Sequence, residues 1–262
     1  MFTTSHDGVE LWFEVAGDGP AVLLIPGRGD SSDVYPERFR ALLLARGCRV
    51  IRFDPRDAGL SGDGGSTYTV SDMGDDVIAV LDAADVTSAH LVGLSLGGLI
   101  LVEVASRRPE LVGSVGFLAA MSPDPDAGMG DDFFAESGAN PLEDMVRAMG
   151  PVSEDDRSWV RAELARAAGR APARPDAGAR HQDAALRFGW PTLEQVEEIS
   201  KRALVIHGDF DRVLPLAHAQ TLHRAIAGSR LVVMAGMGHL PRPTEWDTIA
   251  EHTARHVLAT VD

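Results

Sequence analysis

Residues 90–100 read HLVGLSLGGLI, and this stretch decides the fold. The apolar run that ends at Leu94 predicts a strand, and the apolar run after Gly97 predicts a helix, so Ser95 falls on the turn between them. A serine on such a tight turn is strained, and side chains at the flanking glycines would collide with neighbouring backbone. Gly-x-Ser-x-Gly in this context is typical of a nucleophile elbow, in which the serine attacks the substrate. A glycine-rich turn with an incidental serine is the alternative.

Short apolar runs recur on both sides of this turn. They cover residues 9–15, 21–25, 49–53, 89–94, 112–118, 203–206 and 231–234. Several are continuous rather than alternating, which is typical of strands in a parallel sheet that is covered on both faces. Helical periods over residues 70–84, 96–108 and 244–258 separate the strands, and Thr69 and Asp72 are placed to cap the first of these helices. We therefore predict an α/β fold with a mostly parallel central sheet flanked by helices.

The stretch from residue 122 to residue 195 interrupts this alternation. It contains no convincing strand, has helical patterns near residues 141–149 and 154–168, and includes the Pro/Ala/Gly-rich piece 171–178, in which we expect no regular helix. We interpret it as a small helical lid inserted before the strand at 203–206. The predicted domain organisation is a core made of residues 1–121 and 196–262, with a lid of residues 122–195.

A serine hydroxyl needs a base that takes its proton, and the base needs an acid that orients it. Of nine histidines, His239 lies in the glycine-rich stretch 236–241, which follows the last predicted strand, and we expect it to be the base. We expect the other candidates on polar or helical stretches to be solvated: His6, His218, His223, His252 and His256. His90 precedes the elbow strand and so lies at the wrong end of the sheet.

The acid is expected in the loop after the strand at 203–206, where the chain reads HGDFDRVLP over residues 207–215. We favour Asp211, because a carboxylate late in this loop can reach the loop that bears His239. Asp209 is an alternative, although its position also suits a turn cap. Asp124 and Asp126, after the preceding strand, remain further alternatives. His207 is expected to pack at the strand end.

Composition limits the partners. The formal net charge is -15, and the chain has no run rich in Lys or Arg, so we expect neither nucleic acid nor an anionic membrane as a partner. Cys48 is the only cysteine, which excludes an intrachain disulfide and a cysteine-based metal site, and we expect no cofactor and no metal. The N-terminus does not have the pattern of a signal peptide, so a cytoplasmic protein is expected.

The residues quoted above resemble the α/β-hydrolase superfamily, in its esterase and haloperoxidase-like branch. Residues 54–61, DPRDAGLS, look like a loop of that family in which Asp57 stands in place of a glycine, a variant similar to polyketide methylesterases of the aclacinomycin methylesterase type. The resemblance implies that the backbone N–H groups of Arg28 and Leu96 form the oxyanion hole. Family members often carry His-Gly after the strand at 21–25, but this chain reads PGRGD over residues 26–30. The Arg28 side chain is expected either to bind a substrate carboxylate or to pair with Asp30 or Asp33.

Together these features predict a serine hydrolase that cleaves an ester or lactone of a medium-sized, apolar small molecule through an acyl-enzyme. Apolar side chains in or beside the lid are expected to pack its helices and in part to line the pocket: Met121, Met129, Phe133, Phe134, Met145, Met149, Trp159, Phe188 and Trp190. The same three residues could also serve carbon–carbon bond hydrolysis or perhydrolysis. A ligand-binding module without catalysis is a further alternative, because a fold does not fix a function.

Overall fold

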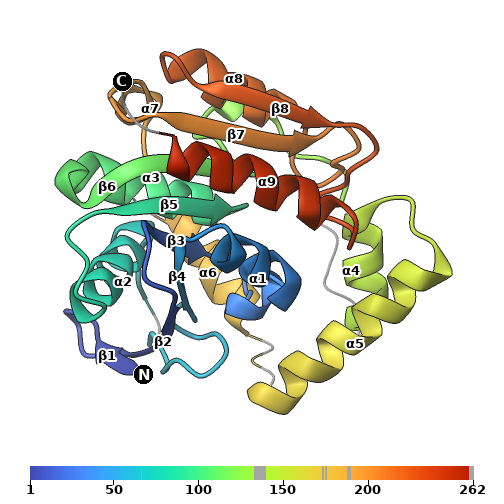
Figure 1. Ribbon diagram of the computed structural model, residues 1–262, viewed down its shortest axis with the longest axis horizontal. Helices are drawn as coiled ribbons and strands as arrows, with labels where there is room; N and C mark the ends of the chain where they lie inside the picture. Colours follow the sequence, from blue (N-terminus) through green and yellow to red (C-terminus); the bar gives the residue numbers. More distant parts are fainter. Residues whose placement is uncertain (66, 133–139, 173, 175, 188–189, 260–262) are drawn as a thin grey trace.

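The computed structural model describes residues 1–65, 67–132, 140–172, 174, 176–187 and 190–259 (Figure 1). Over these residues the chain forms an eight-stranded sheet in the order β1-β2-β4-β3-β5-β6-β7-β8. The strands are β1 (Phe2–Thr4), β2 (Glu10–Ala16), β3 (Ala21–Ile25), β4 (Arg49–Phe53), β5 (Ala89–Leu94), β6 (Val112–Leu118), β7 (Ala203–Gly208) and β8 (Arg230–Met234). From β4 to β8 the neighbours are parallel, whereas β1 and β2 join the edge antiparallel. The predicted fold class is confirmed.

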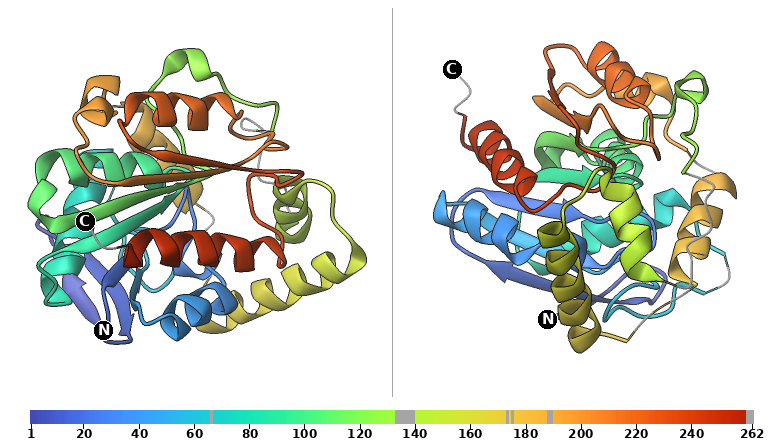
Figure 2. Two further views of the ribbon diagram at one scale, coloured as in Figure 1. Left: turned by 45° about the horizontal axis from the view of Figure 1, so that its top comes forward. Right: turned by 90° about the vertical axis from the view of Figure 1, so that its right-hand side faces the viewer.

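Helices cover both faces of the sheet and form two apolar cores. Helices α1 (Glu37–Ala45) and α9 (Glu245–Leu258) pack on one face, and α2 (Val70–Ala83), α3 (Gly97–Arg107) and α8 (Ala217–Ala225) pack on the other. The left view of Figure 2 shows α8 and α9 on opposite sides of the strands. The described residues also form three short 3-10 helices: η1 (Ser32–Val34), η2 (Pro109–Leu111) and, between β6 and β7, η3 (Pro125–Ala127). The continuous apolar runs of the central strands are therefore buried from both sides.

The chain between β6 and β7 is helical, and its described residues contain no strand. Its helices are α4 (Pro141–Met149), α5 (Glu154–Arg170), α6 (Ala177–Arg187) and α7 (Leu193–Glu197). We expected no regular helix over residues 171–178, but α6 already begins at Ala177. A Cβ added to Gly29 would lie 2.8 Å from the Gly178 Cα, so α6 begins in close contact with the loop after β3. None of the described helices has both the length and the apolar character that a membrane span requires.

Arginines on α5 fasten the segment between β6 and β7 to the loops that follow β3 and β4; this segment, residues 119–202, is called the inserted segment below. Arg166 lies 2.7 Å from the carboxylate of Asp33, and Arg170 makes two contacts of 2.8 and 2.9 Å with the carboxylate of Asp54. Both carboxylates are almost completely buried, so losing an arginine would leave a buried charge without its partner. Figure 1 shows α4 and α5 beside the end of the sheet where β5, β7 and β8 finish. The insertion therefore borders the edge at which the predicted site residues emerge.

Candidate active site

Ser95 lies between β5 and α3 with a φ of +54°, in the left-handed region that a serine rarely adopts. The flanking glycines make this turn possible. A Cβ on Gly93 would lie 2.3 Å from the Gly97 carbonyl oxygen, and a Cβ on Gly97 would lie 2.4 Å from the Ile25 carbonyl oxygen. The Ser95 N–H donates to the Leu118 carbonyl at 3.1 Å, which ties the turn to the end of β6. The predicted strand–turn–helix thus presents Ser95 at the edge of the sheet.

His239 faces Ser95 from the loop after β8. Its Nε2 lies 3.0 Å from the Ser95 Oγ, and its side chain is mostly buried. The residues on either side of it are bonded to the C-terminal end of α4: the Gly238 N–H donates to the Met149 carbonyl and the Leu240 N–H to the Ala148 carbonyl. These two bonds satisfy carbonyls that the helix leaves open and fix the loop that carries the imidazole. The inserted segment therefore supports this loop directly.

Asp211 lies on the far side of the imidazole. Its Oδ2 is 2.8 Å from the His239 Nδ1, and its Oδ1 accepts the backbone N–H groups of Val213 and Leu214 at 2.9 and 2.8 Å. Burial disfavours the ionised form of Asp211, but the imidazoles of His239 and His207 outweigh burial and hold the pKa of this carboxyl well below its usual range. An ionised Asp211 requires the proton of neutral His239 on Nδ1. The Nε2 lone pair is then free to accept the Ser95 hydroxyl proton.

His207 is more closely involved than the sequence suggested. It is fully buried at the end of β7, as expected of a packing residue, but its Nε2 also lies 3.3 Å from the Asp211 Oδ2 and 2.9 Å from the Leu214 carbonyl oxygen. The spacing of four residues in HGDFD was the available signal. Because the loop turns back at once, this spacing places the imidazole against the carboxylate. Sequence reasoning therefore missed a second contact of Asp211.

The alternative acids and histidines lie elsewhere. Asp209 accepts the Gly236 N–H at 2.6 Å, and Asp124 accepts the Thr221 hydroxyl at 2.8 Å. The expectation that His218 is solvated is wrong. This ring is fully buried, bonded to the Ser122 N–H at 3.1 Å and to the Gly128 carbonyl at 2.7 Å, because it joins α8 to the segment that leaves β6. Of the remaining candidates in that group, His6 and His223 are exposed, and His252 and His256 are half-buried.

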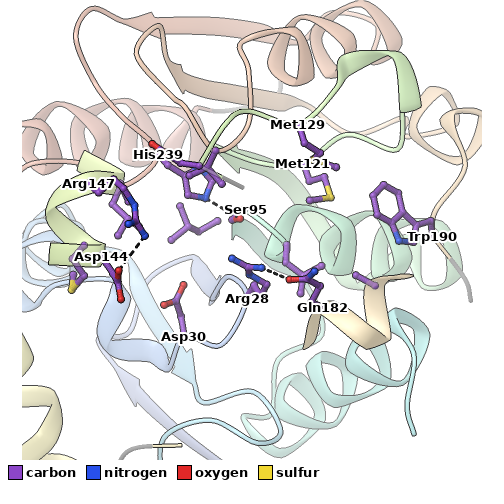
Figure 3. Close-up of a pocket in the computed structure, with 18 residues that line it drawn as sticks. Arg28, Asp30, Ser95, Met121, Met129, Asp144, Arg147, Gln182, Trp190 and His239 are labelled. Atoms are coloured by element: carbon purple, nitrogen blue, oxygen red, sulfur yellow. Dashed lines mark hydrogen bonds and ion pairs between the residues drawn. The ribbon is translucent and has the colours of Figure 1, made fainter. Parts of the chain in front are cut away.

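The residues expected to form the oxyanion hole border Ser95. Strands β3 and β5 are paired so that Ile25 lies opposite Gly93, and both strands therefore end at the same edge. A Cβ added to Gly27 would lie 3.2 Å from the Ser95 Cβ, which shows how closely the loop after β3 approaches the turn. Leu96 precedes the first turn of α3. The Arg28 side chain bonds to Gln182 of α6 (Figure 3).

The two carboxylates expected as partners of Arg28, those of Asp33 and Asp30, lie in different places. Asp33 is held by Arg166 and Arg170 of α5. Asp30 borders the pocket beside Arg28, and burial raises its pKa to about 6 against the opposing charges of His239 and Arg28. The charge of Asp30 in turn favours the protonated guanidinium of Arg28, against the effect of burial on its pKa.

A cavity of about 270 Å³ opens in front of Ser95 and His239 (Figure 3). Four of the apolar side chains singled out in the sequence line it: Met121, Met129, Met145 and Trp190. Met149 and Trp159 instead pack between α4 and α5. Phe133, Phe134 and Phe188 lie outside the described residues. The cavity also carries charged groups, among them the ion pair of Asp144 and Arg147 at 3.1 Å.

The loop of residues 54–61 is built around buried charges. The guanidinium of Arg56 is fully buried between Asp76 and Asp7, at 2.7 and 2.9 Å. Asp57 has a φ of +67°, in the left-handed region that favours glycine. Its carboxylate accepts the Gly64 N–H at 2.8 Å and the Tyr68 hydroxyl at 2.7 Å. These bonds compensate for the unfavourable backbone conformation.

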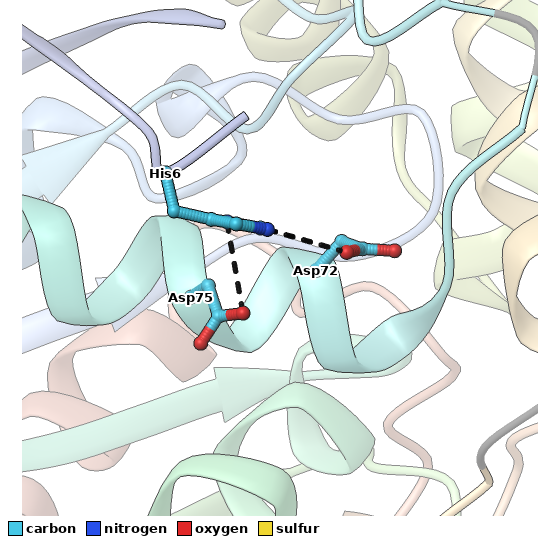
Figure 4. Close-up of side chains that lie close together, drawn as sticks. All are labelled: His6, Asp72 and Asp75. Carbon is cyan, nitrogen blue, oxygen red and sulfur yellow. Dashed lines mark ion pairs between the residues drawn. The ribbon is translucent and has the colours of Figure 1, made fainter. Parts of the chain in front are cut away.

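One group of side chains has the composition of a metal site. The imidazole of His6 lies 3.8 Å from Asp72 and 3.6 Å from Asp75 (Figure 4). The two ring nitrogens face different carboxylates, and Asp72 is committed to Thr69 in the cap of α2. Asp75 is paired with Arg107 at 2.7 Å. His6 is exposed and the two aspartates are half-buried, so the group is an ion-pair cluster in which both carboxylates already have other partners.

Comparisons with known proteins agree with this architecture. A family model described as the alpha/beta hydrolase fold matches residues 20–243. Rhodomycin D methylesterase DnrP of Streptomyces peucetius is 30% identical over 98% of this chain and 98% of its own length. The 2-hydroxymuconate semialdehyde hydrolase of Pseudomonas sp. (strain CF600) is 30% identical over 95% of this chain and 88% of its own length.

Two further matches are weaker evidence for the family. The putative carbamate hydrolase RutD of Variovorax paradoxus (strain S110) is 42% identical, but the match spans only 43% of each protein. The solved esterase RhEst1 from Rhodococcus sp. ECU1013 superimposes with a TM-score of 0.81 over 97% of this chain and 98% of its own, at 23% identity, which supports the fold alone. The family match over most of the chain is decisive: this protein belongs to the α/β-hydrolase fold family and is a hydrolase.

Proposed function

We propose that this hydrolase cleaves a carboxylic ester or a lactone of a medium-sized, largely apolar small molecule through an acyl-enzyme. The observation that carries the proposal is the continuous chain of contacts from the Ser95 Oγ through His239 to Asp211, which faces the cavity. A strained serine that is bonded to a buried, oriented imidazole is the arrangement that activates a hydroxyl nucleophile.

The reaction follows from this geometry. The Ser95 Oγ attacks the carbonyl carbon while His239 Nε2 takes its proton, and the N–H groups of Arg28 and Leu96 stabilise the negative oxygen. His239 then gives the proton to the leaving alkoxide, and the ester bond breaks. Water attacks the acyl-enzyme in a second cycle of the same steps and frees the acid. Asp211 stabilises the imidazolium in both halves.

The cavity and the relatives support the substrate class. Methionines and a tryptophan form much of its wall, which suits an apolar ligand body, while Arg28, Asp30 and Gln182 offer polar contacts on one side. A relative that is similar along almost its whole length is a methylesterase. We therefore propose the ester as the first substrate to test.

A fluorophosphonate probe, which labels activated serines, tests the proposal directly. The native protein should be labelled at Ser95 and should hydrolyse members of a panel of aryl esters and lactones. Ser95→Ala should lose labelling and about three to six orders of magnitude of turnover while it stays folded. Ser122→Ala is a matched control, because Ser122 is also bonded to a histidine but is fully buried behind the site. An unlabelled native protein would favour a non-catalytic ligand-binding module.

Carbon–carbon bond hydrolysis is the second candidate, and one observation favours it: a relative over most of this chain is a semialdehyde hydrolase. The same serine, histidine and aspartate could serve both reactions, so labelling does not separate them. The two reactions are separated by product analysis with a matched pair of substrates, an ester and a vinylogous diketone. Faster cleavage of the diketone would replace the ester proposal, and formation of a peracid from ester and hydrogen peroxide would indicate perhydrolysis.

A further inference from the structure

The loop after β3 is held by a histidine from the inserted segment. The Gly29 N–H donates to the Nδ1 of His181 on α6 at 2.9 Å, and the His181 Nε2 lies 2.8 Å from the Arg56 carbonyl oxygen. Because Nδ1 accepts, the ring proton lies on Nε2 and is donated to Arg56. The ring is fully buried, and burial lowers the pKa of His181, which favours this neutral form.

The neighbours of His181 fasten α6 to the same two loops. Arg180 lies 3.0 Å from the carboxylate of Asp57, and Gln182 accepts a hydrogen bond from the Arg28 side chain. The backbone of Gly178, one turn earlier, approaches Gly29 so closely that a side chain on Gly29 would collide with it. Three consecutive side chains and a glycine contact thus define where α6 sits on the loop.

The backbone of this loop needs such support. Gly29 has a φ of +76°, a conformation that glycine leaves easily because many others are open to it. The sequence PGRGD at residues 26–30 contains no histidine of its own to hold the loop. A backbone N–H stabilises a developing oxyanion only if it already points at the right place before the reaction. The hydrogen bond from the Gly29 N–H to His181 holds the peptide group that joins Arg28 to Gly29. It therefore restricts the backbone on one side of Arg28.

We propose that His181 is a positioning residue, which holds the loop of residues 26–30 so that the Arg28 N–H faces the oxyanion formed on attack by Ser95. This inference rests on the proposed acyl-transfer function. It assigns the inserted segment a part in transition-state stabilisation in addition to any part in substrate binding.

Two amide variants separate the two hydrogen bonds of His181. An asparagine places its carbonyl oxygen near the position of Nδ1, so His181→Asn keeps an acceptor for the Gly29 N–H. A glutamine places its amide nitrogen near the position of Nε2, so His181→Gln keeps the donor to Arg56 and loses the acceptor. Each variant removes one bond to a backbone group. A purely structural role therefore predicts similar melting temperatures and similar activities for both.

The proposal predicts different activities. With an aryl ester that the native protein hydrolyses, His181→Gln should lower kcat about 30-fold with KM changed less than about threefold, because a loop displaced by about 1 Å misplaces the oxyanion donor. His181→Asn should stay within about fivefold of the native kcat. The affinity for a trifluoromethyl ketone, which forms a tetrahedral adduct on the serine, should fall in parallel with kcat/KM across the variants.

The outcome that overturns the proposal is an equal activity loss in both variants that follows their melting temperatures, or an unchanged affinity for the trifluoromethyl ketone. His218→Gln and His218→Asn are matched controls, because His218 also joins a backbone N–H to a backbone carbonyl while fully buried. That pair should lose stability without separating in kcat. A native protein that fluorophosphonate does not label would instead reject the proposed function, so the two failures are distinguishable.

Discussion

His207 Nε2 lies 3.3 Å from Asp211 Oδ2, and this oxygen is the one that His239 Nδ1 approaches to 2.8 Å. One carboxylate oxygen is thus shared by two imidazoles, and the other accepts two backbone N–H groups. Such a carboxylate has little freedom to rotate. The orientation of His239 therefore depends on a residue that makes no contact with Ser95.

Replacement of His207 should show this dependence. His207→Leu removes the imidazole that lies 3.3 Å from the charged Asp211 carboxylate and 2.9 Å from the Leu214 carbonyl oxygen, and we expect about a tenfold loss of kcat/KM toward an ester, since contacts of a polar group with a charged one contribute roughly 1.5–3 kcal/mol. His207→Gln can keep a donor near the position of Nε2 and should recover most of the activity. Steady-state kinetics at pH 8 measures both. Equal activity in the Leu and Gln variants would show that His207 only packs.

The strain at Ser95 predicts that glycine at this position gives a more stable protein than alanine. Ser95→Ala and Ser95→Gly should both abolish turnover, but only glycine relieves the φ of +54°. We expect Ser95→Gly to be more stable to unfolding than Ser95→Ala by about 1 kcal/mol. Urea denaturation followed by circular dichroism makes the comparison. If Ala and Gly are equally stable, the turn stores no strain that depends on the side chain.

The carboxyl group of Asp30 predicts a pH-dependent stability. Burial raises its pKa to about 6 in the folded protein, above the ordinary value of 3.8. The folded state then binds this proton more tightly than the unfolded chain, so stability declines as the pH rises from about 4 to about 6. Asp30→Asn lacks this decline and should melt about 2 °C higher than the native protein at pH 8, with no gain at pH 4. The exposed Asp18 offers a control in Asp18→Asn, which should show no such difference.

Replacing Asp57 has two opposite effects on the free energy of unfolding. Asp57→Gly relieves a positive φ, which favours stability by about 1 kcal/mol, but it removes the acceptor for the Tyr68 hydroxyl and the Gly64 N–H. Hydrogen bonds to a buried carboxylate outweigh that relief, so we expect a net loss of about 2 kcal/mol. Asp57→Asn tolerates the same φ and keeps an acceptor, so it should lose less. Thermal unfolding of the three proteins gives the order, and a more stable glycine variant would reverse the argument.

Much of the core could be predicted because its signals are local. The run at residues 21–25 matches β3, and the run at 112–118 matches β6, since burial on both faces leaves a continuous apolar stretch. The cap of α2 by Thr69 and Asp72 was also expected, and the structure confirms both of its hydrogen bonds. Ser95, Asp211 and His239 follow the ends of β5, β7 and β8, as the sequence predicts, and their side chains are in contact. Their catalytic roles stay a prediction.

What the sequence did not show depends on contacts between distant segments. The sequence indicates no role for His181, because nothing near it shows that its ring contacts Gly29, which is 152 residues away. The polar helical pattern around His218 predicts a solvated ring, whereas its backbone partners lie in the chain that leaves β6. The short strand β1 was not expected either, because three residues at a sheet edge carry too weak a pattern.

The inserted segment is bonded to both halves of the site, through the carbonyls at the end of α4 on the His239 loop and through His181 of α6 on the loop that bears Arg28. If His181 acts as proposed, a segment grafted here from a relative has to keep the end of α4 and a histidine at position 181, or the rate changes along with the substrate range. The positions open to diversification are the side chains of Met129, Met145 and Trp190, which face the cavity without holding either loop.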